Sequence, residues 1–294
     1  MSRSSNASIQ KIESFKNFMV RISITMNFVL IDGSYYVFYR FHALHIWWKH
    51  AKPSEEAIPC ESELFKSKFR DTFLSKIGEI DKRLGIEDSI KIVGKDCPRS
   101  EIWRNQIYPE YKGTRKSCAN TVGPFFAMTY GEGLFEEAGV QAEFGHPTLE
   151  ADDCLAITTR HIRKFYPEAH VWIITSDTDY LQLAEDKVHL RSLQFKDLTE
   201  AKSCSGNPRQ DLFCKIVSGD KSDNIPAVFD KCGPKTAMKL YKDRETFDEK
   251  LAKQPESQNT YMRNSILIDF KNIPKDLVAG FTESNIPRLK ELVK

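Results

Sequence analysis

The sequence predicts an α/β protein whose central, twisted and mostly parallel sheet is flanked by helices. Short apolar runs alternate along the chain with longer amphipathic stretches, which is the order of strands and crossover helices in doubly wound sheets. The runs are apolar throughout, as expected of parallel strands buried on both faces. Acidic residues follow several of these runs directly, at the strand ends where open α/β sheets place their ligands.

The expected strands and helices alternate through the first two thirds of the chain. Residues 28–31, 90–93 and 171–175 are compact apolar runs and therefore predicted strands, and residues 188–193 are a candidate fourth. Apolar residues at helical spacing predict the helices. These helices are expected at residues 34–50, 61–84, 152–165, 210–217 and 235–241.

The pattern divides the chain into three parts. Residues 1–25 are Ser-rich and basic, and we expect a flexible extension there; a transit peptide, or translation starting upstream of Met26, would give the same composition. Residues 26–207 hold all the expected strands and form the expected α/β domain. Within it, residues 97–135 are expected to leave the sheet, because they carry no strand-like run. Residues 208–294 are expected to form a helical C-terminal part.

Bulk composition excludes little. Lys and Arg total 43 against 41 Asp and Glu, so net charge alone argues for no particular partner. The seven cysteines form no CxxC or Cys/His pair at zinc-like spacing, and we expect reduced thiols in an intracellular protein. No apolar segment approaches the roughly 20 residues needed to cross a bilayer, so we expect a cytoplasmic protein without a membrane partner.

The acidic residues are the most informative feature. They stand where apolar runs end or helices begin, and they are Asp32, Asp96, Glu150, Asp152, Asp153, Asp177, Asp179, Asp220 and Asp223. Each has an ordinary alternative, such as a turn residue at Asp32 or a helix cap at Glu150. Together those alternatives require several separate coincidences. Converging carboxylates need cations to remain ionised, so the pattern predicts divalent metal.

This donor set suits phosphodiester chemistry. Two divalent ions about 4 Å apart can lower the pKa of an attacking water and stabilise the departing oxyanion. Hard cations prefer the oxygen ligands that these carboxylates supply. A dehalogenase-like phosphatase would also use a strand-end Asp, but within Asp-x-Asp-x-Thr. The sequence after Asp32 lacks the second Asp, which argues against that class.

Five motifs carry a resemblance to a known family. They are Leu30-Ile31-Asp32-Gly33-Ser34, Tyr108-Pro109-Glu110-Tyr111-Lys112-Gly113-Thr114-Arg115, Glu150-Ala151-Asp152-Asp153, Ser176-Asp177-Thr178-Asp179 and Gly219-Asp220-Lys221-Ser222-Asp223-Asn224-Ile225-Pro226. In this order and spacing they resemble the 5′-nucleases, which include flap endonucleases, the 5′-nuclease domains of bacterial DNA polymerase I and bacteriophage 5′–3′ exonucleases. Among the phage enzymes, the sequence most resembles the T4-type ribonuclease H.

The resemblance implies a PIN-like 5′-nuclease fold with a helical arch over about residues 97–135 and a C-terminal helix–turn–helix subdomain. It implies that residues 26–207 are catalytic and that residues 208–294 bind duplex. The first, catalytic metal site would be held by Asp32, Asp96, Glu150 and Asp152. The second would be completed or tuned by Asp153, Asp177, Asp179, Asp220 and Asp223. The cofactor would be two ions of Mg²⁺ or Mn²⁺, and the residues named as catalytic are Lys112, Arg115, Asp32 and Asp177.

The resemblance also implies nucleic-acid contacts. Lys112 and Arg115 match basic residues above the scissile phosphate, although a solvated basic loop is the alternative. Phe38 matches an aromatic that stacks on a terminal base, with a core aromatic as the alternative. The remaining expected contacts are Arg99, Arg104, Tyr111, Lys116, Lys235, Thr236 and Lys239. Residues 227–232 lack the glycines that relatives carry there, which puts the monovalent cation site of the helix–turn–helix in doubt.

These expectations define a metal-dependent 5′–3′ exonuclease or flap endonuclease. It would act on DNA flaps, nicks and ends, with RNA–DNA hybrid as a further candidate, and would remove primers or flaps in replication. We expect a monomer; a single-strand-binding protein and a sliding clamp are candidate partners. The alternatives are a non-catalytic nucleic-acid-binding relative, which the complete acidic set disfavours, and a PIN-type ribonuclease, which is usually shorter and lacks the basic segment.

Overall fold

The computed structural model describes residues 26–51, 61–115 and 121–294. The expected extension at residues 1–25 and the expected contact at Lys116 lie outside the described residues. The described chain contains a five-stranded sheet in the order β3-β2-β1-β4-β5, in which neighbouring strands pair in parallel. The strands are β1 (Asn27–Asp32), β2 (Ser89–Gly94), β3 (Ala142–Phe144), β4 (His170–Ile174) and β5 (Val188–Arg191). The predicted parallel α/β sheet is confirmed.

Helices cover both faces of the sheet. One face packs against an aromatic cluster from α2 (Gly33–Ala51), α3 (Glu63–Gly78), α4 (Ile80–Leu84), α5 (Gly123–Gly131) and α6 (Leu134–Glu137). The other face packs against α7 (Ala151–Phe165) and α12 (Lys275–Leu292). The sheet is therefore buried on both sides, which explains why its strands are apolar throughout.

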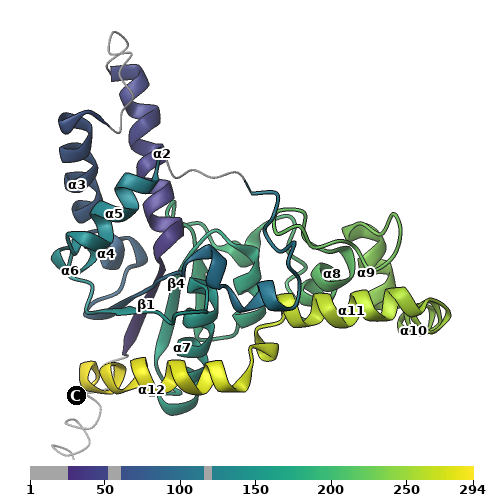
Figure 1. Ribbon diagram of the computed structural model, residues 1–294. Coiled ribbons are helices and arrows are strands. Elements are labelled where there is room, and N and C mark those ends of the chain that lie inside the picture. The colour runs from purple at the N-terminus through teal and green to yellow at the C-terminus, as the bar shows by residue number, and fades with distance from the viewer. Residues whose placement is uncertain (1–25, 52–60, 116–120) are drawn as a thin grey trace, which may run out of the picture.

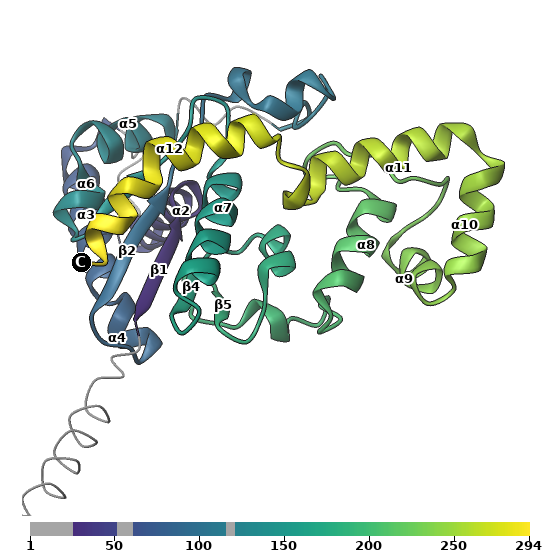
Figure 2. The same cartoon turned by 90° about the horizontal axis from the view of Figure 1, so that it is seen from below.

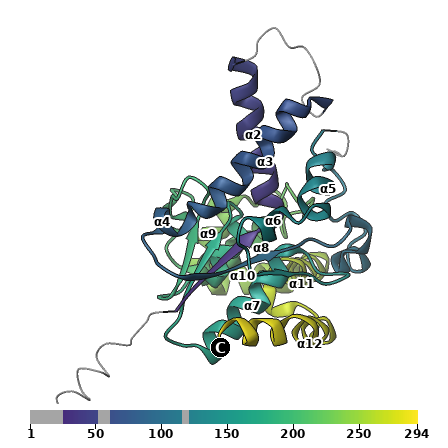
Figure 3. The ribbon, with the colours of Figure 1, turned by 90° about the vertical axis from the view of Figure 1, so that its left-hand side faces the viewer.

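The helix predicted at residues 61–84 is two helices in the structure. α3 begins after Ser62, whose Oγ accepts a hydrogen bond from the Phe65 amide at 3.3 Å. It ends at Gly78, a residue of poor helix propensity, and α4 starts again at Ile80. α2 and α3 project from the body of the molecule as a pair (Figure 3).

The C-terminal part extends from the opposite side of the molecule (Figure 1). It consists of α8 (Pro208–Ser218), α9 (Pro234–Lys242), α10 (Arg244–Lys253) and α11 (Pro255–Ile268). These helices share a small core of their own that includes Phe213, Val217 and Phe247. The chain then returns to the sheet, where α12 lies along α7 and β3 (Figure 2).

The start of α7 lies close to the end of β2 because Gly94 has no side chain. A Cβ at this position would stand 2.7 Å from Leu155 Cγ and 2.9 Å from Ala151 O, both in α7. The close approach brings the acidic residues at the start of α7 next to those that follow β1 and β2. The strand ends and the first turn of α7 therefore meet at the carboxyl edge of the sheet.

Candidate metal centre

Asp32 is the last residue of β1, Asp96 follows β2, and backbone amides hold both carboxylates. Asp32 Oδ1 accepts from the Tyr35 amide at 3.0 Å, and Asp96 Oδ1 accepts from the Ala151 amide at 2.8 Å. The Ser34 hydroxyl donates to Asp96 Oδ2. These bonds fix the direction of both carboxylates before any ligand arrives.

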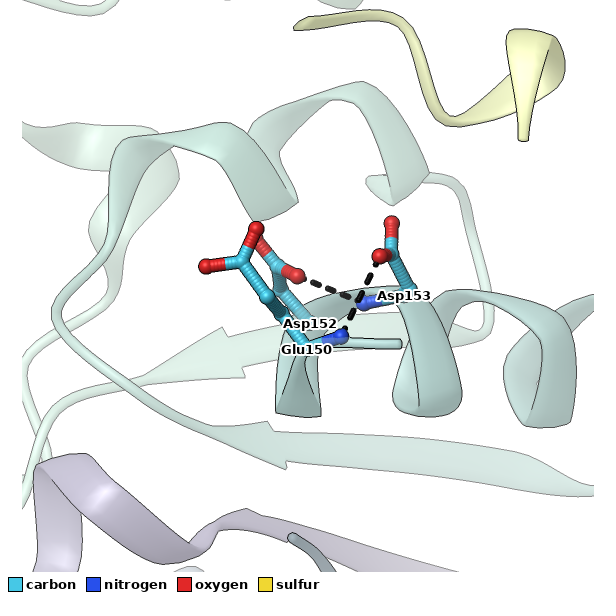
Figure 4. A group of neighbouring side chains, drawn as sticks. All are labelled: Glu150, Asp152 and Asp153. Atoms are coloured by element: carbon cyan, nitrogen blue, oxygen red, sulfur yellow. Dashed lines mark hydrogen bonds between the residues drawn. The ribbon is translucent and has the colours of Figure 1, made fainter. Parts of the chain in front are cut away.

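The first turn of α7 adds three more carboxylates, from Glu150, Asp152 and Asp153 (Figure 4). Each offers an oxygen within 4.8 Å of the others. The Glu150 amide donates to Asp153 Oδ2 at 3.3 Å, and the Asp153 amide donates to Asp152 Oδ1 at 2.7 Å. The helix N-terminus thus orients the acidic side chains and favours their negative charge. We call Asp32, Asp96, Glu150 and Asp152 the first acidic group.

Arg104 neutralises part of this charge from inside the protein. It is only 2% exposed and bonds Glu150 Oε2 at 2.8 Å and Asp153 Oδ1 at 2.7 Å. Trp103 Nε1 donates to Asp153 Oδ2 at 2.9 Å, so both Asp153 oxygens are engaged. The resemblance assigned Asp153 to the second metal site, but the structure places it beside Glu150 and Asp152.

Two of the residues expected to contact nucleic acid are buried. Arg104 was expected on a phosphate-facing surface, and the structure buries it in the ion pairs described above. Tyr111 is 6% exposed, and its hydroxyl donates to Glu150 Oε2 at 3.1 Å and to Asp223 Oδ2 at 3.2 Å. Buried carboxylates need internal donors, and these two side chains supply them.

Residues that come later in the sequence form a second acidic group. Asp179, Asp220 and Asp223 each offer an oxygen within 4.8 Å of the others. Asp177 is exposed and accepts from the Asp179 amide at 2.9 Å. We call these three residues, together with Asp177, the second acidic group. The Asp220 carboxylate also accepts from the Ser222 amide at 2.7 Å, which shapes the turn that carries it.

Residues 108–115 form a basic turn above both groups. Lys112 Nζ pairs with Glu150 and lies 3.9 Å from Asp223 Oδ2, and Arg115 pairs with Asp223. The Lys112 backbone adopts a positive φ of 55°, and its amide donates to Asp223 O at 2.9 Å. Arg99 donates to the carbonyls of Lys112 and Arg115, so it supports the turn.

The electrostatics of the acidic groups favour a cation. Burial, and then Asp96, raises the pKa of Asp32 to about 7. Burial raises the pKa of Asp179 to about 7 despite Lys215, and that of Asp152 well above its usual range. In the described chain the carboxylates outnumber the basic side chains that pair with them. Crowded oxygen donors of this kind fit a hard divalent ion, and the acidic groups could bind metal.

The other predicted nucleic-acid residues lie on two separate elements. Phe38 is half-buried on α2 and packs edge-on against Phe126, with ring centroids 5.1 Å apart, so its stacking role stays a prediction. Lys235, Thr236 and Lys239 are exposed on α9, where a duplex could reach them. These roles also stay predictions.

Sequence reasoning missed Lys215, the basic residue of the second acidic group. It projects from α8 and pairs with Asp179 and with Asp220, the latter at 2.9 Å. A sequence signal existed, because Lys215 lies near the end of the helix predicted at residues 210–217, shortly before the motif that contains Asp220. Spacing alone could not reveal the pairing with Asp179, because that residue belongs to a different element.

The fold and the site define a parallel α/β protein with two acidic groups beneath a basic turn, and its architecture is consistent with a PIN-like fold. The family model described as the 5′-3′ exonuclease N-terminal resolvase-like domain matches residues 27–207. The chain belongs to this 5′-3′ exonuclease family. In the part of the chain that the structure describes, no helix is both long and apolar enough to span a bilayer.

Two curated relatives illustrate the similarity. The 5′-3′ exonuclease of Bacillus subtilis (strain 168) is 32% identical over 170 residues, covering 54% of this chain and 55% of the relative. Ribonuclease H of Enterobacteria phage T4 is 33% identical over 148 residues, covering 45% and 46%. The chain therefore spans about half the length of each of these relatives.

A solved structure shows the same fold. The flap endonuclease of bacteriophage T5, solved in complex with DNA and metal ions, aligns with a TM-score of 0.63 at 21% identity. The alignment covers 92% of this chain and 100% of that protein. It extends beyond the 27–207 match into the C-terminal helices.

Proposed function

We propose that the protein is a metal-dependent 5′-nuclease that hydrolyses DNA phosphodiesters near 5′ ends and flap junctions, for primer or flap removal. The observation that carries the proposal is the pairing of two acidic groups at the sheet edge with the basic turn above them. Acidic groups alone would suit many metal sites. The added Lys112 and Arg115 suit a substrate that is itself anionic, which points to a phosphodiester.

The first acidic group would hold one divalent ion, and the second would hold another, Mg²⁺ or Mn²⁺ by the hardness of the oxygen donors. When bound, such ions supply a water of lowered pKa and stabilise the departing oxyanion. The chain's own contribution is orientation. The Tyr35 and Ala151 amides direct Asp32 and Asp96, and Arg104 holds Glu150 in place from below.

Lys112 and Arg115 would contact the scissile phosphate. Neighbouring Glu150 and Asp223 raise the pKa of Lys112 above its usual range despite its burial, so its ammonium stays charged at neutral pH. Arg115 is held by Asp223 and by the Ser222 carbonyl at 3.1 Å. Both cations are thus positioned at the mouth of the acidic groups and are ready to receive negative charge from a substrate.

Residues 208–294 would bind the duplex beside the site through exposed residues of α9. The helix presents Lys235, in its first turn, and Lys239, in its last turn, to solvent. Contacts of this kind go to phosphates and carry no sequence information. In the proposed division of labour, residues 26–207 supply the first acidic group and the basic turn. Residues 208–294 supply Asp220 and Asp223 of the second acidic group and the duplex contact.

A cleavage assay tests the proposal. The wild-type chain is incubated with 5′-labelled flap, nicked duplex, single-stranded DNA and RNA-primed DNA, each with Mg²⁺, with Mn²⁺ and with EDTA. We expect cleavage only with the divalent ions, and product sizes that separate exonuclease from flap endonuclease action. Asp177→Asn is expected to abolish it, whereas Asp248→Asn, an exposed acid on α10, removes the same charge far from the site and is expected to leave it unchanged.

The possible results are decisive. Cleavage that persists in EDTA with the wild type and disappears with Asp177→Asn would overturn the metal mechanism. Binding of all four substrates without cleavage of any would establish the non-catalytic alternative. Cleavage of RNA but not of DNA would favour the PIN-type ribonuclease.

A further inference from the structure

The ammonium of Lys215 lies within the second acidic group, where it contacts Asp179 and stands 2.9 Å from Asp220 Oδ2. We propose that Lys215 is a resident counter-ion that a divalent cation must displace from this group, and that Asp211 receives the displaced ammonium. Lys215 would then set the affinity of the second site without touching the substrate. The inference rests on the proposed function, because it concerns the metal sites of that function.

The first argument is competition for the same oxygens. The Lys215 side chain is 19% exposed and those of Asp179 and Asp220 are 12% and 16% exposed, so water screens this contact poorly. A divalent ion bound to Asp179 and Asp220 would be within a few ångströms of the ammonium if Lys215 stayed in place. Like charges a few ångströms apart repel strongly where water screens them poorly. The divalent ion and the Lys215 ammonium therefore cannot both bind Asp179 and Asp220.

Loss of a proton does not resolve the conflict. The ion pairs with Asp179 and Asp220 require the ammonium form, which is the ordinary state of a lysine side chain at neutral pH. The side chain therefore remains an ammonium in the metal-free protein. It must move if the cation is to bind.

The structure provides a place for it to move to. A cavity of about 330 Å³ borders the second acidic group and is lined by Asp179, Lys215, Asp220 and Asp211, among others. Asp211 stands four residues before Lys215 on α8, at the spacing at which helical side chains of opposite charge meet.

Asp211 is also free to accept the ammonium. Its carboxylate accepts from the Ser205 amide at 3.0 Å and from Cys204 Sγ at 3.1 Å. Over the described ranges, no lysine or arginine forms an ion pair with it. A rotation of the Lys215 side chain within the cavity would exchange Asp179 and Asp220 for Asp211, so the ammonium would keep a carboxylate partner.

Counting bound Mn²⁺ tests the inference without measuring activity. The metal-free full chain is titrated with Mn²⁺, and free Mn²⁺ is measured by electron paramagnetic resonance. We expect a tighter and a weaker site in the wild type. Lys215→Met is expected to tighten the weaker site by about tenfold, whereas Lys215→Arg, which keeps the charge, is expected not to tighten it. Circular dichroism establishes that each variant is folded.

A matched control separates displacement from general electrostatics. Lys221 lines the same cavity and neighbours Asp220 but is exposed, and within the described chain it forms no ion pair with the second acidic group. Lys221→Met removes the same charge from the same cavity. It is expected to change the weaker site by less than about twofold. An equal effect of Lys221→Met and Lys215→Met would overturn the inference.

A double-mutant cycle tests the role of Asp211. Asp211→Asn is expected to weaken the second site by about threefold or more when Lys215 is present, because the displaced ammonium loses its acceptor. In the Lys215→Met background, the same change is expected to have no effect. Equal effects in both backgrounds would contradict the proposed movement of the Lys215 ammonium to Asp211.

Failure of this inference is distinguishable from failure of the proposed function. Two Mn²⁺ sites whose affinities are unchanged by Lys215→Met would overturn the inference while leaving the nuclease proposal intact. No Mn²⁺ binding by the wild type at all would overturn both.

Discussion

Arg104 is the residue on which the acidic groups depend most for their stability. It neutralises Glu150 and Asp153 in the interior and also donates from Nε to the Leu267 carbonyl at 2.8 Å. Buried carboxylates without such a partner would lower their charge by binding protons or would destabilise the fold. One side chain therefore joins the start of α7 to the end of α11.

Arg104→Leu is expected to lower the free energy of unfolding by about 3–5 kcal/mol, because it leaves buried carboxylates unpaired. Urea denaturation followed by circular dichroism measures the loss. Arg99→Leu, which removes an exposed arginine from the same segment, is expected to cost less than about 1 kcal/mol.

The double variant Arg104→Leu/Asp153→Asn should regain part of that stability, since it removes one of the stranded charges. No recovery would mean that the loss comes from packing around Trp103 and not from the charges.

Asp32 offers a test of pH dependence. Its pKa in the folded chain is raised to about 7 from an ordinary value of 3.8, so the folded state binds the proton more tightly than the unfolded state. Between about pH 4 and pH 7, the free energy of unfolding of the metal-free protein should therefore fall as the pH rises. Asp32→Asn removes this contribution, because the amide does not titrate.

In EDTA at about pH 7.5, Asp32→Asn is expected to be more stable than the wild type by about 1–2 kcal/mol, and at about pH 4 the two should be nearly equal. Urea unfolding at both pH values measures the difference. A variant that is less stable than the wild type at the higher pH would contradict the prediction. The same variant is expected to lose cleavage, so the group that destabilises the empty protein is the one that the proposed chemistry needs.

At the scale of single residues, the sequence predicted where the acidic residues lie but not whether the basic residues face solvent or an internal acid. Strand ends and helix starts locate carboxylates, because parallel strands deliver their ends to one edge. Whether a basic residue faces solvent or an internal acid depends on tertiary packing. Arg104 follows the buried Ile102 and Trp103, and that apolar context was the available signal of its burial.

At the scale of elements, short pieces were the hardest to predict. The strands over 28–31, 90–93, 171–175 and 188–193 were predicted because their apolar runs are long enough to stand out, and all four are present. β3 was missed because it has only three residues and lies at the edge of the sheet, where it pairs with β2. α10 and α11 were missed because their apolar residues are sparse and their small core forms only after assembly.

The helix α9 carries the proposed duplex contact, and its charge can be reversed. Lys235→Glu/Lys239→Glu is expected to weaken binding of a nicked duplex and to make that binding less dependent on salt, because fewer phosphates are neutralised. Fluorescence anisotropy at several salt concentrations, with Ca²⁺ or EDTA to prevent cleavage, measures both quantities.

Lys290→Glu, on the exposed face of α12, changes charge far from α9 and serves as the control. Equal weakening by the two changes would show that net charge matters and that α9 is not a contact.

At the scale of the whole molecule, α12 ties the C-terminus to the sheet. Phe281 packs edge-on against Phe144 of β3, with ring centroids 6.1 Å apart, and Asn285 donates to the Gly145 carbonyl at 3.1 Å. Phe281, Ile286 and Leu289 belong to the same core as β1, β4 and α7. The proposed boundary after residue 207 therefore separates two parts in sequence, while the last helix of the second part completes the core of the first.

Removal of residues 273–294 is expected to abolish cooperative unfolding, because it exposes the apolar face that α12 covers. Differential scanning calorimetry would show no sharp transition, and limited proteolysis would cleave throughout residues 26–207. A truncated chain that melts cooperatively within a few degrees of the full chain would contradict this. Leu292→Ala, at the last turn of α12, is a milder change and should keep the transition.

The acidic groups draw their members from points spread between Asp32 and Asp223, and the core beneath them closes only with Leu289. A ribosome that is still making this chain therefore has no complete set of acidic groups on a closed core until the residues as far as Leu289 have been added. Partial products, from stalled synthesis or from proteolysis, lack the arrangement as well. If the acidic groups cleave nucleic acid, the fold itself ensures that only chains extended past Leu289 can do so.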